Sequence, residues 1–412
     1  MELIILTIII FSLAALFYLR VKLFRLNIKF LEGPDLKARK PFLDLSAIIH
    51  FHTAYSDGSM TLGDVIKIAR SLKADIAVSS DHNTLKPRYD GAEGYYNGLF
   101  YFAGEEINTN YGHLLALGVR EEIERGDYER VLENIKKQNA ISVICHPHNW
   151  WTPWKNFDVT GYDGIEVINL DSQWRGMNPF YIFIVFLTYW INPFYAMHFL
   201  AHKPKKTIKF WDNVQRGESM KAGIASIDAH SNVKITKKIR VKFPKYEELF
   251  SVSRTHILLG EGLSGKNEEI EKDIEKVTAA LKSGKCYFSF DMFGSPKGFY
   301  FEAVLKNQVY SSGDAVHLYL KDIDNKDESM IVYSGIRINP KANPFIISLF
   351  LNGQKLTVSG NTDLKYEIPF NRLEELSQKY RSLFLRIEVD VLFGWKKITY
   401  LYSNNIGVIF RG

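Results

Sequence analysis

The sequence predicts an α/β protein with a β-sandwich-like domain at its C-terminus and an apolar helix at its N-terminus. Short apolar runs alternate with helical patterns between residues 46 and 294, which is typical of βαβ units and a parallel sheet. From Ser295 onward, apolar and polar residues alternate over short segments, as they do in half-buried strands. An uncharged run, Leu3–Leu19, precedes both regions.

The apolar run at the N-terminus is long enough to cross a membrane, because a helix rises about 1.5 Å per residue and the hydrocarbon core is roughly 30 Å thick. A cleaved signal peptide is the alternative, but the basic start and the small-residue cleavage site of such a peptide are missing. Arg20, Lys22, Arg25 and Lys29 follow the run, and no Lys or Arg precedes it. The positive-inside rule therefore predicts a single-pass membrane protein whose body is cytoplasmic.

The strands and helices of the α/β region follow one another closely. Ser46–Phe51 is a predicted strand, Thr61–Leu72 a helix and Asp75–Ser80 a second strand, and together they form one βαβ unit. Further strands are predicted at Leu99–Phe102, Leu114–Gly118, Ser142–Cys145, Gly164–Ile168 and Gly223–Ile227, and further helices at Glu129–Gln138 and Glu268–Leu281. In parallel α/β barrels catalytic residues gather at the carboxyl ends of the strands, so the residues after each run are the candidates for chemistry.

Polar motifs follow these strands, and they contain seven of the chain's 11 histidines: His50, His52, His82, His113, His146, His148 and His230. Residues i and i+2 of a strand point to the same face, so His50 and His52 can reach one ion or two adjacent ions. Asp228 and His230 repeat this spacing. A single histidine at a strand end is usually structural, but this clustering predicts a multinuclear metal site. Imidazole and carboxylate ligands without thiolates suit Zn, Mn or Fe, and paired ions can activate water against a phosphoryl group.

The composition excludes several other classes of protein. With 46% hydrophobic and 24% charged residues, the chain is globular rather than disordered. A net charge of +6 over 412 residues is too diffuse to indicate a nucleic-acid binder, although it allows a basic patch. The two cysteines, Cys145 and Cys286, exclude a disulfide framework and a cysteine-rich zinc module.

The order of the motifs resembles the PHP (polymerase and histidinol phosphatase) superfamily. The motifs are His-Phe-His-Thr-Ala-Tyr-Ser-Asp-Gly-Ser, Ser-Asp-His-Asn-Thr, Gly-Glu-Glu-Ile, Gly-His-Leu-Leu-Ala-Leu-Gly, Cys-His-Pro-His and Ile-Asp-Ala-His-Ser. The Ser-Asp-Gly variant and the late Asp-Ala-His-Ser are similar to the CehA/McbA-type metallohydrolases. The resemblance covers residues 47–290 and implies a distorted (β/α)7 barrel, a two- or three-metal site and phosphoesterase chemistry.

Carried over position by position, the resemblance implies these metal ligands: His50, His52, Asp57, His82, Glu106, His113, His146, Asp228 and His230. Glu106 is preferred to Glu105, because the family pattern is Gly-x-Glu and its acid bridges two metals. Many relatives have His at the position of Asp57, so a third ion depends on this substitution. Asp81 is expected to orient His82 or to be a turn residue. His148 is a candidate general acid or substrate contact.

A second apolar stretch, 176–202, carries many aromatic residues and no Asp, Glu, Lys or Arg, and Asn192-Pro193 interrupts it. Predicted ligands precede and follow it, so a single membrane crossing would divide the site, and the stretch is too short for two crossings of about 20 residues each. A membrane-contacting hairpin is favoured over a buried one, because aromatic residues suit the headgroup region.

Three basic residues are candidate contacts for the phosphate of a substrate: Lys86, Arg88 and Arg175. Surface Lys and Arg side chains are, however, usually solvated.

The C-terminal region is predicted to be mostly strands. Ala315–Leu320, Ile346–Leu351 and Leu383–Val391 alternate, Asn352-Gly353 is a hairpin signal, and one short helix is predicted at Arg372–Tyr380. The predicted domains are an anchor at 1–24, a tether at 25–45, the metallohydrolase domain at 46–294 and a β-sandwich-like domain at 295–412.

These expectations describe an enzyme, a membrane-anchored hydrolase that uses two or three divalent ions (Mn, Zn or Fe) to cleave a phosphate ester. The substrate class includes nucleotides, oligonucleotides, sugar phosphates and lipid headgroups, and nucleic acid enters only as a substrate. Membrane lipid is the expected partner of residues 3–19 and 176–202. Two alternatives stay open: the same centre hydrolysing a carboxylic or carbamic ester, and a non-catalytic binding module.

Overall fold

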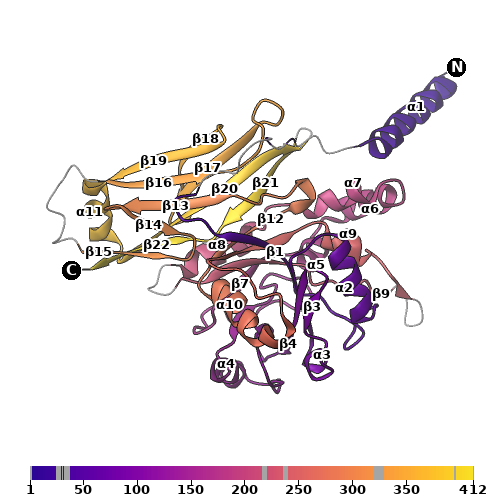
Figure 1. Cartoon of the computed structure of the whole chain (residues 1–412). Coiled ribbons are helices and arrows are strands. Elements are labelled where there is room, and N and C mark those ends of the chain that lie inside the picture. Colours follow the sequence, from indigo (N-terminus) through magenta and orange to yellow (C-terminus); the bar gives the residue numbers. More distant parts are fainter. Residues whose placement is uncertain are drawn as a thin grey trace.

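The computed structural model describes residues 2–24, 29, 31, 38–215, 220–234, 240–319, 329–393 and 396–411. The predicted apolar helix is present as α1 (Glu2–Lys22), which stands apart from the rest of the molecule in Figure 1. Among the described residues, α1 is the one helix long and apolar enough to cross a membrane, a property that a signal sequence shares. Residues 25–28, 30 and 32–37 of the predicted tether lie outside the described residues.

The α/β region contains each of the strands and helices that the sequence predicts. Its strands are β1 (Leu43–Ile49), β2 (Ile76–His82), β4 (Leu99–Asn108), β5 (His113–Leu117), β6 (Ile141–Ile144), β7 (Gly164–Asn169), β8 (Ala222–Ser226), β11 (Arg254–Leu259) and β12 (Cys286–Ser289), with the short strands β3 (Gly94–Tyr96), β9 (Val233–Lys234) and β10 (Arg240–Val241) beside them. The helices are α2 (Leu62–Ser71), α3 (Lys86–Tyr89), α4 (Tyr128–Lys137), α5 (Leu170–Arg175), α8 (Lys205–Val214), α9 (Tyr246–Phe250) and α10 (Ile270–Lys282). Each long helix buries one apolar stripe, as α2 does with Val65 and Ala69.

The predicted parallel arrangement is wrong for one of the seven predicted strands, β5, and the additional strands β3, β11 and β12 also pair antiparallel with their neighbours. β1, β2 and β4 are parallel, and so are β6, β7 and β8, but β5 runs antiparallel to both β4 and β6. The reason is the connection between β4 and β5, residues 109–112, because a parallel pairing needs a crossover of about a dozen residues or more. The reversal brings the amino end of β5 to the edge where its neighbours have their carboxyl ends.

The two ends of this strand series meet beside β1. The backbone N–H of Ile227 donates to the carbonyl of Ile49 over 3.0 Å, and Phe51 forms a parallel bridge with Ala229. β11 pairs antiparallel with the first residues of β1, on the edge of β1 that faces away from β2. The strands therefore curve into a ring of mixed direction, which differs from the regular alternation of strand and helix in a (β/α)7 barrel.

The C-terminal region forms two layers of strands, as Figure 1 shows. One layer is β14-β13-β16-β19. The other continues the sheet of the α/β region through β12 to β21, β20, β22 and β15, with β17 beside β20 and β18 beside β17. The bounds are β13 (Tyr300–Leu305), β14 (Gln308–Ser311), β15 (Ala315–Tyr319), β16 (Ser329–Gly335), β17 (Phe345–Leu351), β18 (Gln354–Ser359), β19 (Asp363–Pro369), α11 (Phe370–Lys379), β20 (Ser382–Phe393), β21 (Lys396–Ser403) and β22 (Ile406–Arg411). Residue 320 of a predicted strand lies outside the described residues. The predicted hairpin is confirmed, since Asn352 and Gly353 both have positive φ, 48° and 76°.

The two predicted large domains share this sheet. β12 pairs with β21 antiparallel, and Tyr287 lies opposite Ser403. A boundary at residue 294 therefore separates segments of the chain, but it does not separate two sheets.

The aromatic stretch 176–202 forms a helical hairpin beside the end of α1 (Figure 1). It consists of α6 (Pro179–Tyr189), α7 (Pro193–Met197) and the 3-10 turn η1 (His198–Leu200). Asn192 separates the two helices and begins the second one, because its side chain accepts a hydrogen bond from the N–H of Tyr195. The same side chain donates to the carbonyl of Val21 over 3.0 Å, which joins the hairpin to α1.

Candidate metal centre

The nine predicted ligands converge at one edge of the strand ring. His50 and His52 follow β1, His82 ends β2, and His146 follows β6. Asp228 and His230 follow β8, and Asp57 lies in the loop after His52. His113 reaches the same edge from the first residue of β5, because that strand is reversed. Glu106 lies inside β4, which extends further than the sequence predicts.

Glu106 is at the centre of the group. Its Oε1 lies 2.6 Å from His113 Nδ1 and 3.0 Å from His146 Nε2. Its Oε2 lies 2.9 Å from His82 Nδ1 and 3.2 Å from His52 Nε2. Oε2 also lies 3.4 Å from His50 Nε2. Oε1 thus faces two imidazoles and Oε2 faces three others, which is the arrangement of a carboxylate that bridges two ions. Glu105, on the opposite face of the strand, accepts a hydrogen bond from the N–H of Ile123 and takes no part in the group.

The spacing of the side chains fits bound cations. Ligand atoms of His50, His52, Glu106 and Asp228 all lie within 4.8 Å of one another, and so do those of His82, Glu106 and His113. The buried atoms Glu106 Oε2 and His82 Nδ1 lie 2.9 Å apart without the geometry of a hydrogen bond, and neither makes a hydrogen bond elsewhere within the described residues. Buried polar atoms without hydrogen bonds are rare in proteins. Their convergence with imidazole nitrogens therefore indicates a site for divalent metal ions.

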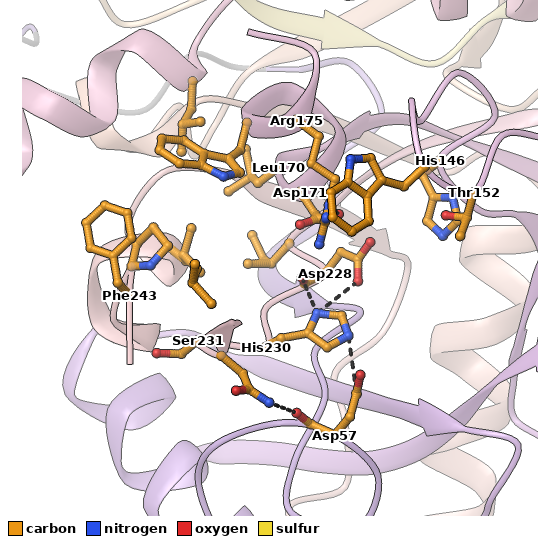
Figure 2. A pocket seen from close by; sticks show the side chains of 18 of the residues that line it. Asp57, His146, Thr152, Leu170, Asp171, Arg175, Asp228, His230, Ser231 and Phe243 are labelled. Carbon is orange, nitrogen blue, oxygen red and sulfur yellow. Dashed lines mark hydrogen bonds and ion pairs between the residues drawn. The ribbon is translucent and has the colours of Figure 1, made fainter. Parts of the chain in front are cut away.

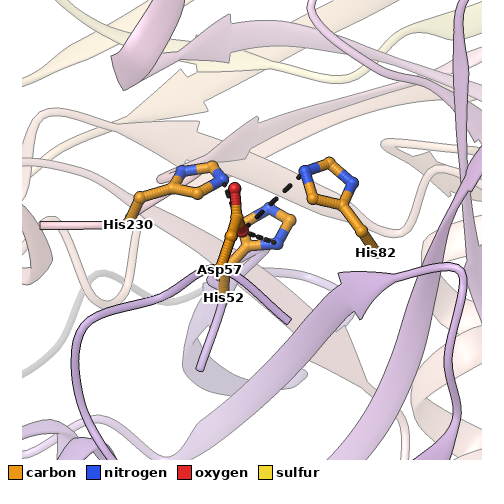
Figure 3. A group of neighbouring side chains, drawn as sticks. All are labelled: His52, Asp57, His82 and His230. Atoms are coloured by element: carbon orange, nitrogen blue, oxygen red, sulfur yellow. Dashed lines mark ion pairs between the residues drawn. The ribbon is translucent and has the colours of Figure 1, made fainter. Parts of the chain in front are cut away.

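Asp57 joins His52, His82 and His230 in the outer part of the group (Figure 3). Its Oδ1 lies 3.3 Å from His230 Nε2, 3.7 Å from His52 Nδ1 and 4.0 Å from His82 Nε2. Burial raises the pKa of Asp57, but the hydrogen bond and the charge of His230 lower it more, and the pKa is about 2. The carboxylate is thus charged at neutral pH and completes a third set of potential ligands.

The loop that carries Asp57 is fixed by two features of its sequence. A Cβ atom on Gly58 would lie 2.4 Å from the carbonyl oxygen of His52, so only glycine fits there. The Asp81 carboxylate accepts hydrogen bonds from the N–H of Thr53 over 2.8 Å and from the Ser56 hydroxyl over 2.6 Å. Asp81 therefore holds the loop of Asp57, a role that differs from both predicted alternatives, an orienter of His82 and a turn residue.

The buried carboxylates make this edge favourable for positive charge. Burial lowers the pKa of His146, but the hydrogen bond to Glu106 and the charge of Asp228 raise it more, to about 9. Burial likewise lowers the pKa of His50, but Glu166, Asp228 and Glu106 raise it well above its ordinary value. A negative field that holds protons on buried imidazoles also attracts divalent cations. Three of the ligands, His50, His146 and Asp228, have positive φ values of 63°, 29° and 54°, a form of strain that is common at functional sites.

Glu166 is a member of the site that the sequence analysis missed. This side chain is fully buried on β7, and its Oε1 accepts a hydrogen bond from His50 Nδ1 over 2.5 Å. Its Oε2 accepts from the N–H of His146 over 2.7 Å and from Asn169 Nδ2 over 2.9 Å. A carboxylate that binds the far nitrogen of a ligand histidine fixes the tautomer of that histidine. A charged residue inside the apolar run Gly164–Ile168 was the available signal.

His148 lies outside the group. Its Nδ1 is 3.2 Å from the hydroxyl of Thr207, and its ring stacks on Phe157 at 5.2 Å. The structure therefore does not bring this histidine to the position of a general acid.

The metal centre opens into a cavity of about 660 Å³. Figure 2 shows Asp228 and His230 in this cavity between His146 and Phe243. Arg175 also lines it and forms an ion pair with Asp171, whereas Arg88 pairs with Glu93 over 2.6 Å at another surface. Lys86 is not among the residues that line the cavity.

No protein-family model matches the chain, and no curated protein is significantly similar to it in sequence. Several solved structures, among them the following three, show a weak likeness to this chain. A two-domain protein from Bacteroides vulgatus, described as containing a predicted PHP-like metal-dependent phosphoesterase, matches 92% of this chain and 98% of its own, with 14% identity and a TM-score of 0.39. An amidohydrolase from Chromobacterium violaceum matches 45% of this chain and 87% of its own, with 12% identity and a TM-score of 0.28.

The third structure is a protein from Bifidobacterium adolescentis described as a metal-dependent phosphoesterase. It matches 48% of this chain and 93% of its own, with 12% identity and a TM-score of 0.29. At these TM-scores the likeness does not decide the family, so membership of the PHP superfamily and of its CehA/McbA branch stays a prediction from the motifs.

Proposed function

We propose that the chain is a membrane-anchored hydrolase that uses two or three divalent ions (Mn, Zn or Fe) to cleave a phosphate ester. The observation that supports this proposal most is the position of Glu106, whose two oxygens face separate groups of imidazoles. Ions bound there would supply Lewis-acid stabilisation of phosphoryl oxygens and a water of lowered pKa. All nine side chains that would hold them come from one edge of the ring.

The chain's own residues would position the substrate beside this centre. Arg175 lines the cavity, and its ion pair with Asp171 holds the guanidinium on the side of Asp228 and His230 (Figure 2). A guanidinium is suited to planar contacts with phosphate oxygens. Glu166 holds His50 and the backbone of His146, so the imidazoles keep one orientation while a substrate binds.

The contacts of α1 support an uncleaved anchor rather than a signal peptide. Val21, in the last turn of α1, is 0% exposed, and its carbonyl accepts a hydrogen bond from Asn192. The ring of Phe24 lies 5.1 Å from Tyr195 and 5.0 Å from Phe393. A segment that is removed by processing has no need of such contacts with the folded body. The cytoplasmic side is the location favoured by the basic residues after the run.

The exposed face of α6 supports membrane contact by the hairpin. Phe180, Phe183, Phe186 and Trp190 are 63%, 59%, 51% and 78% exposed. Exposed apolar patches of this kind mark interaction surfaces, and aromatic residues are favoured at the membrane interface. The contact of Asn192 with α1 places this patch beside the anchor.

The test is an assay of the purified chain, loaded with Mn²⁺ or Zn²⁺, against phosphomonoester, phosphodiester and carboxylic ester probes. We expect phosphate-ester hydrolysis that is lost when His50 and His52 are replaced by Ala, together with bound metal. His148→Ala is the matched control for metal content, because this histidine lies outside the group. Unchanged activity of the His50/His52 variant would refute a metal mechanism. Hydrolysis of the carboxylic ester alone would support the alternative ester chemistry, and less than one ion per chain would support a binding module.

A further inference from the structure

The cavity beside the metal centre has two chemically different parts. Its floor consists of imidazoles and carboxylates, whereas one set of walls is apolar: Trp174, Ile182, Leu200, Phe243, Pro244 and Leu249. A volume of about 660 Å³ is that of a pocket for a drug-sized ligand, and a phosphate group fills only a small part of it. The remaining space is bounded by apolar atoms, so it suits an apolar part of the ligand.

The apolar wall is formed before any ligand binds. Phe243 is 7% exposed, and its ring lies 4.6 Å from the ring of Tyr189 on α6 and 5.8 Å from that of Trp174 on α5. Leu200 and Leu249 are also buried. Rigid apolar walls favour binding because little side-chain freedom is lost when a ligand packs against them.

The cavity is open to solvent next to exposed aromatic side chains. Trp150 and Trp151 line it and are 77% and 68% exposed. The guanidinium of Arg175, which also lines the cavity, lies 4.7 Å from the centre of the Trp151 ring. Large apolar side chains exposed around a polar site are typical of grooves for ligands with an apolar part.

One helix connects the wall of the cavity to the surface beside the anchor. Ile182 of α6 lines the cavity, whereas its neighbours Tyr181 and Phe183 are 49% and 59% exposed and do not line it. The hairpin that contains α6 is bonded to the end of α1 through Asn192. A ligand with an apolar chain would therefore reach the cavity from a side of the molecule that is itself apolar.

On the basis of the function proposed above, we propose that the substrate is a phosphate ester of an alcohol with a long apolar chain. The phosphate lies at the metal centre, and the chain lies along the wall formed by Ile182, Leu200 and Phe243. In the reaction, the oxygen of water forms a bond to phosphorus, the ester P–O bond breaks, and the leaving oxygen takes up a proton. The products are the free alcohol and a phosphate, without any oxidation or reduction.

The first experiment measures binding without turnover. Butylphosphonate and octylphosphonate, whose P–C bonds resist hydrolysis, are titrated by calorimetry into the full-length, Mn²⁺-loaded chain held in amphipol. Each fully buried methylene is worth roughly fourfold in affinity, so four methylenes give at most about 250-fold. We expect octylphosphonate to bind at least tenfold more tightly. Affinities within about twofold of each other would overturn the proposal.

Two substitutions at adjacent positions of α6 distinguish binding in the cavity from nonspecific binding to the exposed apolar surface. Ile182→Asn puts a polar group on the wall and is expected to lower the ratio of octyl to butyl affinity at least fivefold. Phe183→Asn changes an exposed neighbour that does not line the cavity, so this ratio is expected to stay that of the unmodified chain. Equal effects of the two substitutions would overturn the proposal.

The hydrolysis of butyl phosphate tests the proposed function separately. No hydrolysis together with a clear preference for octylphosphonate would refute the chemistry and retain the apolar site, whereas hydrolysis without the preference would refute the apolar site alone. A final comparison sets phosphatidic acid in vesicles against octyl phosphate in solution. Higher kcat/KM for the first supports a bilayer lipid as the source, and higher kcat/KM for the second supports a soluble amphiphile.

Discussion

Replacing Glu166 by Gln tests whether the metal centre depends on a carboxylate that is not itself a predicted ligand. Glu166 is fully buried and accepts three hydrogen bonds, from His50, His146 and Asn169. A glutamine keeps one acceptor oxygen but presents an NH₂ group to the remaining donors. The substitution therefore leaves at least one buried donor facing another donor, without a change in side-chain size.

The structure predicts two effects of Glu166→Gln. Loss of the support behind a ligand histidine typically weakens metal binding by about 10–100-fold, or about 1.4–2.8 kcal/mol. The unpaired buried donor is expected to lower the free energy of unfolding of the metal-free protein by about 1–3 kcal/mol. The two effects are read separately, the first by titration with Mn²⁺ or Zn²⁺ against a chelator and the second by denaturation in EDTA.

Glu105→Gln is the matched control. Glu105 is a buried carboxyl that accepts from Ile123 and stands apart from the nine ligands, and burial raises its pKa to about 8. Above pH 8 the buried carboxyl must be ionised, which lowers stability, and a neutral glutamine avoids this cost. We therefore expect no loss of stability above pH 8. We also expect unchanged metal affinity, because Glu105 does not contact the ligands. Metal affinity of the Glu166 variant within twofold of the unmodified chain would refute the supporting role of Glu166. An equal loss of metal affinity in both variants would show that the effect is not specific to Glu166.

Three further predictions follow from the contacts of single residues. Gly58→Ala would force a Cβ to within 2.4 Å of the His52 carbonyl, so the loop of Asp57 must shift, and metal analysis should find up to one ion fewer per chain with the fold retained in circular dichroism. His256 lies between Asp291 and Asp44; burial lowers its pKa, but these carboxylates raise it to about 9. Protonated His256 therefore contributes roughly 3 kcal/mol to the free energy of unfolding below pH 6.5, and this contribution is lost as the pH rises through 9. Urea unfolding at a series of pH values measures the loss, and His256→Asn should abolish it. The third test uses a chain that lacks residues 2–19 and measures its binding to anionic vesicles. Trp190→Asn in this chain should weaken the binding several-fold, whereas Leu356→Asn on β18 should not. Equal binding of the two variants and the unsubstituted truncated chain would contradict membrane contact by the aromatic hairpin.

Much of the fold was predictable because its signals are local. Alternation with a period of two located β17 and β20, and the Asn352-Gly353 pair located the hairpin after β17, because backbone preferences of adjacent residues decide both features. The break at Asn192-Pro193 was predictable for the same reason, since a cap and a proline begin a helix wherever they lie.

The contacts between segments that are distant in the sequence were harder to predict from the sequence. β5 is reversed because it pairs with β4, to which a short loop connects it. Asp81 binds Thr53 and Ser56 because the loop after β1 folds over the end of β2. His148 belongs to a motif that looks catalytic, but the turn after β6 directs its ring to Thr207 and Phe157. Such outcomes depend on contacts between residues that are far apart in the chain.

The sequence by itself determined the class of the protein's site and its candidate ligands, because imidazoles and carboxylates at strand ends carry the same chemistry wherever the strands are placed. It also determined the apolar helix and the aromatic stretch, whose character lies in composition. Only the tertiary structure decided that Glu166 supports His50, that Asp81 holds the loop of Asp57, and that α6 lines the cavity while it adjoins α1. The physical reason is that a site is a set of distances between atoms, and packing of the whole chain sets those distances.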